Sequence, residues 1–282
     1  MFQTVVARHS GSQRGMSAVE LKPSRSDGPQ SNVMVMPLAR GLAVLGAFGA
    51  EQPWLGNHEI AFETGIPAPT VSRMLHSLVA LGYLHYDETR KKYRLTAAAL
   101  SLGYAAIADA DTQRLARIEM QKLAEASDSY VVLGTRDRLD VVVMGSSTRH
   151  PELDLRLTAG ARLHIASSPL GWALLAALPE LERFYLLGNV ERKTGRDWPS
   201  LRRRMAEGIS QVRELGFCMS IGEWEPDLAT IATPVRIPDQ PPLVLACIGL
   251  RARMVRARIE REIGPKMVAT AQALQDRLVA SA

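Results

Sequence analysis

Three features of the 282-residue sequence predict an α+β fold in two domains. Apolar residues recur every three or four positions over much of residues 37–127, which is typical of helices. A short basic hairpin interrupts that pattern at residues 83–95. From Tyr130 onward, runs of β-branched residues indicate strands with helices inserted between them, as expected for an antiparallel sheet covered by helices.

The N-terminal segment begins with a polar stretch and continues with a helix. Residues 1–33 lack an apolar period, so we expect a disordered tail. The first helix is expected at residues 37–50, with one apolar stripe formed by Leu38, Leu42, Leu45 and Phe48. Arg40 lies off this stripe, where it can contact a phosphate.

A helix, a tight turn and a second helix follow. Gly65-Ile66-Pro67 breaks a short amphipathic segment, and a helix is expected from Pro69 to just before Gly82. Helical geometry gives that helix a core face with Val71, Met74, Leu75 and Leu78. Its other face carries the candidate DNA contacts Pro69, Thr70, Ser72, Arg73, His76 and Ser77. This order matches a helix-turn-helix, whose second helix enters the major groove.

A β-hairpin after the second helix is typical of a wing. Residues 83–86 and 93–95 alternate like strands, and the turn between them ends in Arg90, Lys91 and Lys92, which suit phosphate contact. Residues 34–95 are therefore expected to form a winged helix-turn-helix domain for double-stranded DNA, with Arg73 as the first candidate for a guanine or phosphate. The alternatives are a solvated helix pair with an ordinary charged hairpin, or a winged domain that binds protein.

The remainder is expected to be a linker helix followed by an effector-binding domain. The linker helix covers residues 96–111, is too short to form a core alone, and is expected to pack against another subunit or the next domain. The second domain covers residues 112–282. Its helices are expected at 112–127, 168–177, 179–187, 198–215 and 255–279. Its strands are expected near 131–133, 141–144, 153–157, 217–221, 230–237 and 243–250, with a loop at 158–165.

Composition narrows the class of protein. The hydrophobic content of 46% allows a buried core, and the net charge of +5 is compatible with nucleic acid without requiring it. Cys218 and Cys247 have no metal-type spacing and are expected to be buried free thiols, and the six histidines are scattered. No signal peptide or membrane span is recognised, so we expect a cytoplasmic protein with no metal, no cofactor and no catalytic motif.

The order of these elements, together with several local motifs, resembles the IclR family of bacterial transcriptional regulators over residues 36–280. The motifs are 40–45 (RGLAVL), 65–67 (GIP), 70–75 (TVSRML), 81–83 (LGY), 93–95 (YRL), 160–163 (GARL), 167–176 (SSPLGWALLA), 214–217 (ELGF) and 231–235 (IATPV). The resemblance implies a homo-oligomer, a dimer or a dimer of dimers, with a GAF-like C-terminal domain that senses a small organic or aromatic acid. The sequence departs from the family pattern at Ala68-Pro69, His164, Trp172, Asp227 and Thr230.

We expect the effector to bind between the loop 160–168 and the strands near Leu133, Met144, Cys218 and Thr230. Hydroxyls and backbone N–H groups at the start of a helix favour a carboxylate, and Arg162 or His164 supplies positive charge. The full candidate set is Leu133, Met144, Gly160, Ala161, Arg162, His164, Ser167, Ser168, Cys218, Ser220, Glu223 and Thr230. Alternatively, Ser168 only caps its helix and Glu223 is an exposed loop carboxylate. Trp172 and Trp224 either line the pocket or fill the core, and the core is favoured for Trp172. The rival class is an enzymatic C-terminal domain.

Overall fold

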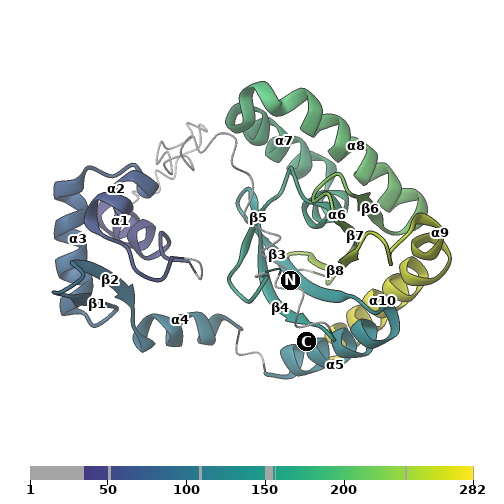
Figure 1. The fold of residues 1–282 in the computed structure, drawn as a ribbon, viewed down its shortest axis with the longest axis horizontal. Coiled ribbons are helices and arrows are strands. Elements are labelled where there is room, and N and C mark those ends of the chain that lie inside the picture. Colours follow the sequence, from purple (N-terminus) through teal and green to yellow (C-terminus); the bar gives the residue numbers. More distant parts are fainter. Residues whose placement is uncertain are drawn as a thin grey trace. The chain divides into compact units, whose positions relative to one another are not determined.

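The computed structural model describes residues 35–49, 52–107, 110–149, 155, 157–238 and 240–281. The predicted tail at residues 1–33 lies outside them. The described residues fall into two compact units, 35–107 and 110–281. The first is helical with one hairpin, and the second contains a six-stranded sheet (Figure 1). The α+β prediction is confirmed.

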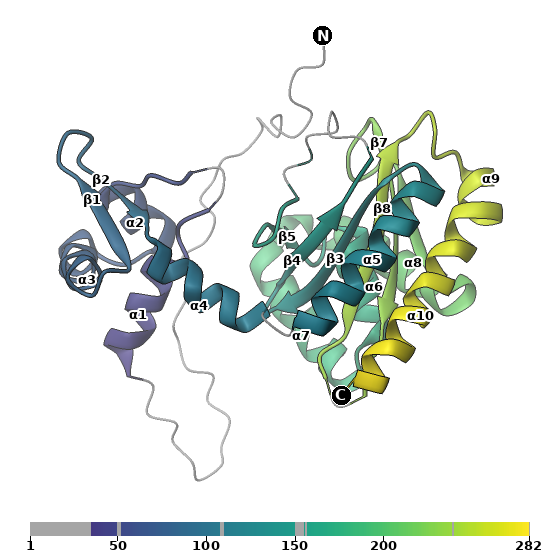
Figure 2. The ribbon, with the colours of Figure 1, turned by 90° about the horizontal axis from the view of Figure 1, so that it is seen from below.

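The N-terminal unit is a small helical core with a hairpin attached (Figure 2). Its elements are α1 (Met36–Leu45), α2 (Asn57–Thr64), α3 (Ala68–Ala80), β1 (Leu84–Asp87), β2 (Lys92–Leu95) and α4 (Ala97–Ile107). The buried core draws on the three helices, the hairpin and the segments between them: Val44, Leu55, Ile60, Ile66, Val71, Leu75, Leu78 and Leu84. Each such side chain contributes roughly 1.5–3 kcal/mol by leaving water.

Two glycines set the ends of the helices in this unit. Gly65 follows α2 with a φ of 65°, a left-handed conformation that favours glycine and turns the chain toward α3. At the other end of α3, Gly82 has a φ of 79°. The Gly82 N–H donates to the Val79 carbonyl and the Tyr83 N–H donates to the Leu78 carbonyl, both at 2.9 Å. This is a Schellman cap, so the predicted stop at Gly82 is confirmed.

The predicted apolar stripe of α1 is wrong in part. Leu38 and Leu42 are 62% and 60% exposed, whereas Val44 is fully buried. Val44 lies two positions after Leu42, about 200° further round the helix, so the two side chains point to opposite sides. The spacing of the leucines identified a helix correctly, but it gave no information about which side the rest of the core would cover.

The second unit is built on one antiparallel sheet with the order β5-β4-β3-β8-β7-β6. Its strands are β3 (Tyr130–Asp137), β4 (Asp140–Ser147), β5 (Arg162–His164), β6 (Cys218–Ile221), β7 (Leu228–Val235) and β8 (Leu243–Leu250). Strands β7 and β8 are buried almost throughout, and β3 is buried over its first five residues, so both faces of the sheet must be covered.

Helices cover both faces of the sheet (Figures 1 and 2). One face packs against α6 (Pro169–Ala177), with α7 (Glu180–Thr194), the short 3₁₀ helix η1 (Gly195–Asp197) and α8 (Trp198–Leu215) outside it. The other face packs against α5 (Ala110–Ser127) and α10 (Gly264–Ser281). Alternate residues of each strand therefore enter two separate cores.

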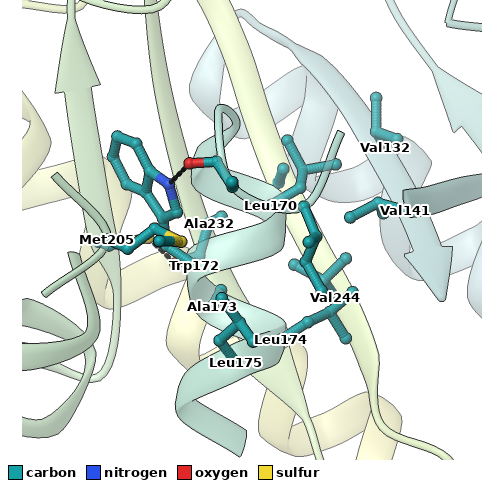
Figure 3. Close-up of a cluster of buried hydrophobic side chains, with 14 of the residues drawn as sticks. Val132, Val141, Leu170, Trp172, Ala173, Leu174, Leu175, Met205, Ala232 and Val244 are labelled. Atoms are coloured by element: carbon teal, nitrogen blue, oxygen red, sulfur yellow. Dashed lines mark hydrogen bonds between the residues drawn. The ribbon is translucent and has the colours of Figure 1, made fainter. Parts of the chain in front are cut away.

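Trp172 of α6 is buried between α6 and α8, so the prediction that it fills the core is confirmed (Figure 3). Its indole N–H donates to the Ala166 carbonyl at 2.8 Å, so its polar atom is satisfied although the side chain is buried. A Cβ added at Gly208 would lie 2.6 Å from the Trp172 ring, so glycine is needed for α8 to approach this closely.

Three further expectations differ from the structure. The predicted loop 158–165 contains β5, which pairs with β4 and completes the sheet. The predicted strand 153–157 falls mostly outside the described residues. The predicted long C-terminal helix is divided into α9 (Arg256–Arg258), a π-helical turn η2 (Ile259–Ile263) and α10. A single turn of π-helix is a local change in winding that leaves the apolar period almost unaltered, so periodicity does not reveal it.

Candidate nucleic-acid interface and effector region

The outward face of α3 carries the predicted DNA contacts. Val71, Leu75 and Leu78 are buried in the N-terminal core, and this fixes which side of the helix faces away from it. On the other side lie six residues that are exposed or half-buried: Pro69, Thr70, Ser72, Arg73, His76 and Ser77. Small hydroxyl side chains around one guanidinium group suit the hydrogen-bonding edges of bases in the major groove.

These residues differ in how freely they can bind a ligand. The Ser77 hydroxyl donates to the Arg73 carbonyl at 3.1 Å, so only its lone pairs remain to face outward. Arg40 is half-buried on α1. Arg73 itself is exposed, and within the described part of the chain its guanidinium forms no ion pair. Arg73 therefore offers the strongest donor group on α3.

The hairpin β1–β2 presents cations at its tip. Its strands pair from Leu84 with Leu95 to Asp87 with Lys92. The backbone N–H groups of Thr89 and Arg90 both donate to the Asp87 carboxylate at 2.9 Å, which lowers the pKa of Asp87 and holds the turn. Lys91 follows with a φ of 51°, and the turn leaves the Arg90 and Lys91 side chains exposed.

Lys92 has a partner within the chain that the sequence did not indicate. Its ammonium lies 3.0 Å from the Glu59 carboxylate on α2. The Gly56 N–H also donates to Glu59 at 2.6 Å, and this bond, followed by Lys92, lowers the pKa of Glu59. The pair neutralises one of the carboxylates near α3 that would otherwise repel phosphate, and it makes Lys92 less available than Lys91.

Trp54 packs against two cationic side chains of the hairpin, Arg90 and Arg94. The predicted DNA contacts included Arg90 but neither Trp54 nor Arg94. The guanidinium carbons of Arg90 and Arg94 lie 5.1 and 5.0 Å from the centre of the Trp54 ring, within cation–π range. The His85 ring meets Trp54 edge-on, with 6.3 Å between centroids. Strand alternation places Arg94 on an exposed face, and that signal was available in the sequence.

The predicted effector segment lies along the edge strand of the sheet. The Gly160 N–H donates to the Val143 carbonyl at 2.8 Å, and the Val143 N–H donates to the Ala161 carbonyl at 2.9 Å. The Arg162 guanidinium lies 2.7 Å from the Asp137 carboxylate and 3.1 Å from the Asp140 carboxylate. Because Arg162 already pairs with two carboxylates, part of its positive charge is neutralised before an anionic ligand binds.

The start of α6 is organised by Ser168. Its hydroxyl oxygen accepts a hydrogen bond from the Gly171 N–H at 3.2 Å, so the predicted cap is confirmed, and its O–H donates to the His164 carbonyl at 3.2 Å. The Ser167 hydroxyl donates to the same carbonyl at 3.4 Å. Burial, with a smaller effect from Lys193, lowers the pKa of His164 and favours the neutral imidazole.

A polar strip lies beneath α6 and α8 on the sheet. Ser220 and Thr230 are opposite each other on β6 and β7, and both are buried. The Ser220 hydroxyl accepts the Trp224 N–H at 3.1 Å. Thr230 is only 1% exposed, and its hydroxyl has no hydrogen-bond partner among the described residues. A buried orphan hydroxyl is rare and indicates a position where a further polar group belongs.

Cys218 and Glu223 flank this strip differently. The Cys218 thiol is buried, donates to the Pro169 carbonyl at 3.3 Å, and has its pKa raised to about 12 by burial. It therefore behaves as a core residue, and Cys247 is likewise a buried free thiol, as predicted. Glu223 is exposed in the loop after β6, where its backbone carbonyl accepts from Arg204 at 3.4 Å.

Two predicted effector residues are not brought together with the rest. Leu133 and Met144 pack on the side of the sheet that faces α5 and α10, whereas Cys218 lies in the core beneath α6. The expectation that they share one pocket wall is therefore wrong. Successive strand residues point to opposite faces, and an irregularity after Leu133 in the pairing of β3 with β4 shifts the register by one residue.

Other features of the described residues limit the chemistry. No group of three or more His, Cys, Asp or Glu residues in this part of the chain can hold a metal ion. None of the described helices is long and apolar enough to cross a membrane. A hollow of about 370 Å³ lies between α7 and α8, and its lining residues include Arg183, Trp198 and Arg213. The described residues that line it include none of the predicted effector residues.

The fold and the cationic α3–hairpin surface define a helix-turn-helix transcriptional regulator with an α+β C-terminal unit. Comparison with known proteins gives the family. The IclR helix-turn-helix domain matches residues 37–88, and the C-terminal domain of bacterial IclR transcriptional regulators matches residues 104–276. The chain belongs to the IclR family, whose members similar to it are transcriptional regulators and not enzymes.

Individual proteins agree with this assignment. The chain is 29% identical over 252 residues to the HTH-type transcriptional regulator TsaQ1/TsaQ2 of Comamonas testosteroni, covering 88% of this chain and 90% of that one. An IclR family regulator from Brucella abortus shares 35% identity and a TM-score of 0.79 over 88% of this chain and 94% of its own. An IclR homolog from Microbacterium hydrocarbonoxydans, complexed with 4-hydroxybenzoate, shares the fold with 22% identity and a TM-score of 0.60 over 84% and 99%.

Proposed function

We propose that this regulator binds operator DNA with α3 in the major groove and the β1–β2 hairpin on the phosphate backbone. The observation that carries the proposal is the exposed face of α3, where Arg73, which forms no ion pair with any described residue, lies among small hydroxyl side chains. Arg90, Lys91 and Arg94 add positive charge on the neighbouring hairpin. Base contacts from α3 would give selectivity, and hairpin cations would give affinity that depends on salt.

The C-terminal unit is proposed to bind a small organic acid. Support comes from the buried Thr230 hydroxyl, which has no hydrogen-bond partner among the described residues and lies beside Ser220 on the face of the sheet beneath α6 and α8. Gly160, Ala161, Arg162, His164, Ser167, Ser168, Cys218 and Glu223 remain in the proposed site or at its border. A relative named as a p-hydroxybenzoate hydroxylase transcriptional activator and the homolog complexed with 4-hydroxybenzoate favour an aromatic acid as the first probe.

The two units are proposed to act together in a homo-oligomer in the cytoplasm, where operators of bacterial genes lie. Binding of the acid would favour one of two conformational states that differ in affinity for the operator. By linkage, operator DNA must then change the affinity for the acid by the same factor. Measuring both changes in affinity therefore tests the proposal quantitatively, because the two factors must be equal.

Two measurements test the proposal. Selection of fragmented genomic DNA on the immobilised protein should enrich a small set of fragments, and enrichment no better than that of bulk DNA would contradict DNA recognition. Isothermal titration with 4-hydroxybenzoate and a panel of aliphatic and aromatic acids should then identify a binder whose addition changes the affinity for an enriched fragment. A binder that leaves this affinity unchanged would contradict the coupling.

A further inference from the structure

The segment that precedes α2 pairs with the hairpin at Leu55. The Leu55 N–H donates to the Tyr93 carbonyl at 3.0 Å, and the Tyr93 N–H donates to the Leu55 carbonyl at 2.8 Å. Leu55 is buried in the core of the N-terminal unit, and Tyr93 packs against that core. Successive residues of an extended chain point to opposite sides, so Trp54 and Arg94 lie together on the outward face of the hairpin.

Trp54 is half-buried and holds two guanidinium groups on this outward face. The guanidinium carbons of Arg94 and Arg90 lie 5.0 and 5.1 Å from the centre of its ring. His85, which pairs with Arg94 across the hairpin, contacts the same ring edge-on. Two guanidinium groups on one ring repel each other, and the attraction of each cation to the ring offsets part of that repulsion. Trp54 therefore keeps together two cations that would otherwise separate.

Both guanidinium groups keep hydrogen-bond donors for a ligand. Arg90 and Arg94 are exposed, and neither side chain donates a hydrogen bond to another described residue. The Arg90 Nε lies 3.9 Å from the Asp87 carboxylate, whereas Arg94 forms no ion pair within the described part of the chain. A guanidinium presents its N–H donors in a rigid fork that matches the geometry of a phosphate. Arg94 is therefore the freer of the two donors, and Arg90 is partly neutralised.

We infer that Trp54 is a positioning residue for DNA, which holds Arg90 and Arg94 as a pair that binds the phosphate backbone. This inference rests on the proposed binding of DNA by the hairpin, and it adds to that surface a residue without charge. An arginine side chain that is mobile in the free protein loses rotamer freedom when it binds a phosphate, and that loss reduces affinity. Trp54 orders both side chains before DNA binds, so less freedom is lost.

The arrangement of the cations favours a nucleic-acid strand over a single small anion. Lys91 lies at the tip of the hairpin next to Arg90, and Arg94 lies further along β2. Cations that follow one another along a ribbon match the regularly spaced charges of a phosphate backbone. Because ordering one long side chain accounts for about 2- to 12-fold in affinity, the loss of Trp54 should weaken binding at least about fivefold.

Fluorescence anisotropy of the full chain with a genomic duplex selected as above, at several salt concentrations, tests the role of Trp54. Trp54→Leu should weaken binding at least about fivefold. It should also flatten the slope of log K against log salt, although it removes no charge, because fewer phosphates are then contacted. Trp54→Phe removes the indole N–H and keeps an aromatic ring, so it should bind within about threefold of wild type.

Double-variant comparisons separate positioning from folding. When Arg90→Ala and Arg94→Ala are already present, Trp54→Leu should have less than about a twofold further effect, because the cations that it positions are gone. When Lys91→Ala is present instead, Trp54→Leu should keep its full effect, since the cations over the Trp54 ring are Arg90 and Arg94. An equal loss in both backgrounds would mean that Trp54 acts through folding or through a contact of its own, and would overturn the inference.

The remaining outcomes distinguish this inference from the proposed function. Equal binding of the wild type to the selected duplex and to a shuffled duplex would overturn the proposed function, and the role of Trp54 with it. Selective binding by the wild type that Trp54→Leu leaves unchanged would overturn the role of Trp54 alone. Wild-type affinity in the variant that lacks both Arg90 and Arg94 would do the same, because no cations would then remain for Trp54 to position.

Discussion

At the level of single side chains, the presence of a hydrogen-bond partner within the chain distinguishes residues that stabilise the fold from residues that remain available to a ligand. Ser77 and Ser168 both looked like ligand-binding hydroxyls in the sequence, and both are occupied by backbone groups of their own helices. Arg73 and Thr230 are different, because the described chain supplies neither an ion pair for Arg73 nor a hydrogen bond for the Thr230 hydroxyl. These two residues are the most informative to change.

Replacing Arg73 with alanine should weaken binding to a selected operator by about 1–3 kcal/mol, or about 5- to 150-fold, because a guanidinium contact to guanine or phosphate is lost. Fluorescence anisotropy with a labelled duplex measures the change. Arg203→Ala is the matched control, since it removes the same charge from an exposed position of α8 where Arg203 pairs with Glu207. Equal effects of the two substitutions would mean that only net charge matters.

Replacing Thr230 with valine should leave the free energy of unfolding unchanged or raise it, because the hydroxyl that is removed forms no hydrogen bond with the described residues. The same variant should lose affinity for the organic acid, as measured by isothermal titration. Thr233 provides a control on the same strand, because its buried hydroxyl donates to the Gly216 carbonyl at 2.8 Å. Thr233→Val should cost about 1 kcal/mol of stability and leave acid binding intact. The reverse pattern would remove Thr230 from the site.

At the level of elements, the hairpin shows what the sequence could and could not predict. Alternation and the turn residues correctly located the two strands and the exposed cations Arg90 and Lys91. The pairing of Lys92 with Glu59 joins residues that are 33 positions apart, and no local pattern reports such a contact. The packing of Arg90 and Arg94 on Trp54 also joins residues that are far apart in the sequence, so no local pattern predicted it.

The two hairpin lysines should therefore behave differently. Lys91→Ala should weaken binding to every duplex alike and reduce the slope of log K against log salt by about 1, since one phosphate contact is lost. Lys92→Ala should change the slope less, because the Lys92 ammonium is already paired with Glu59. Anisotropy titrations at several salt concentrations compare the two variants, and identical slopes would show that the ion pair with Glu59 opens when DNA binds.

The cap of α6 can be tested in the same way. Ser168→Ala should lower the free energy of unfolding by about 1 kcal/mol, because the Gly171 N–H loses its acceptor. Ser200→Ala, near the start of α8, should cost less because its hydroxyl only donates to the nearby Asp197 carbonyl at an exposed position. Urea unfolding provides the values. Unchanged stability with lost acid binding would assign Ser168 to the ligand instead of the cap.

At the level of the whole molecule, the class of fold was predictable and the composition of the effector site was not. Runs such as Leu243–Leu250 indicated the strands, and the order of helices and strands then led to an antiparallel α+β domain. Successive residues of a strand point to opposite faces, and this alternation places Leu133 and Met144 on the face toward α5 and α10, away from the expected pocket. Likewise, the spacing of apolar residues in α1 did not indicate which side of the helix packs against the core.

The chain joins two units whose chemistry is complementary for a regulator. The first unit presents cations and small hydroxyls on a helix and hairpin, and the second holds a buried polar strip inside an otherwise apolar core. The Thr230 hydroxyl adds no evident stability to its unit, since it is buried without a hydrogen-bond partner among the described residues. Such local departures from a well-satisfied structure are expected where a protein binds something else.

The most direct test of this account is the affinity of the full protein for a genomic fragment selected as above, compared with a shuffled duplex of the same composition, at two salt concentrations. We predict that the selected duplex binds at least about 10³-fold more tightly and that both affinities fall steeply with salt. The preference should shrink in Arg73→Ala and persist in Arg203→Ala. Equal binding to both duplexes, or affinity that does not change with salt, would contradict recognition of DNA by α3 and the hairpin.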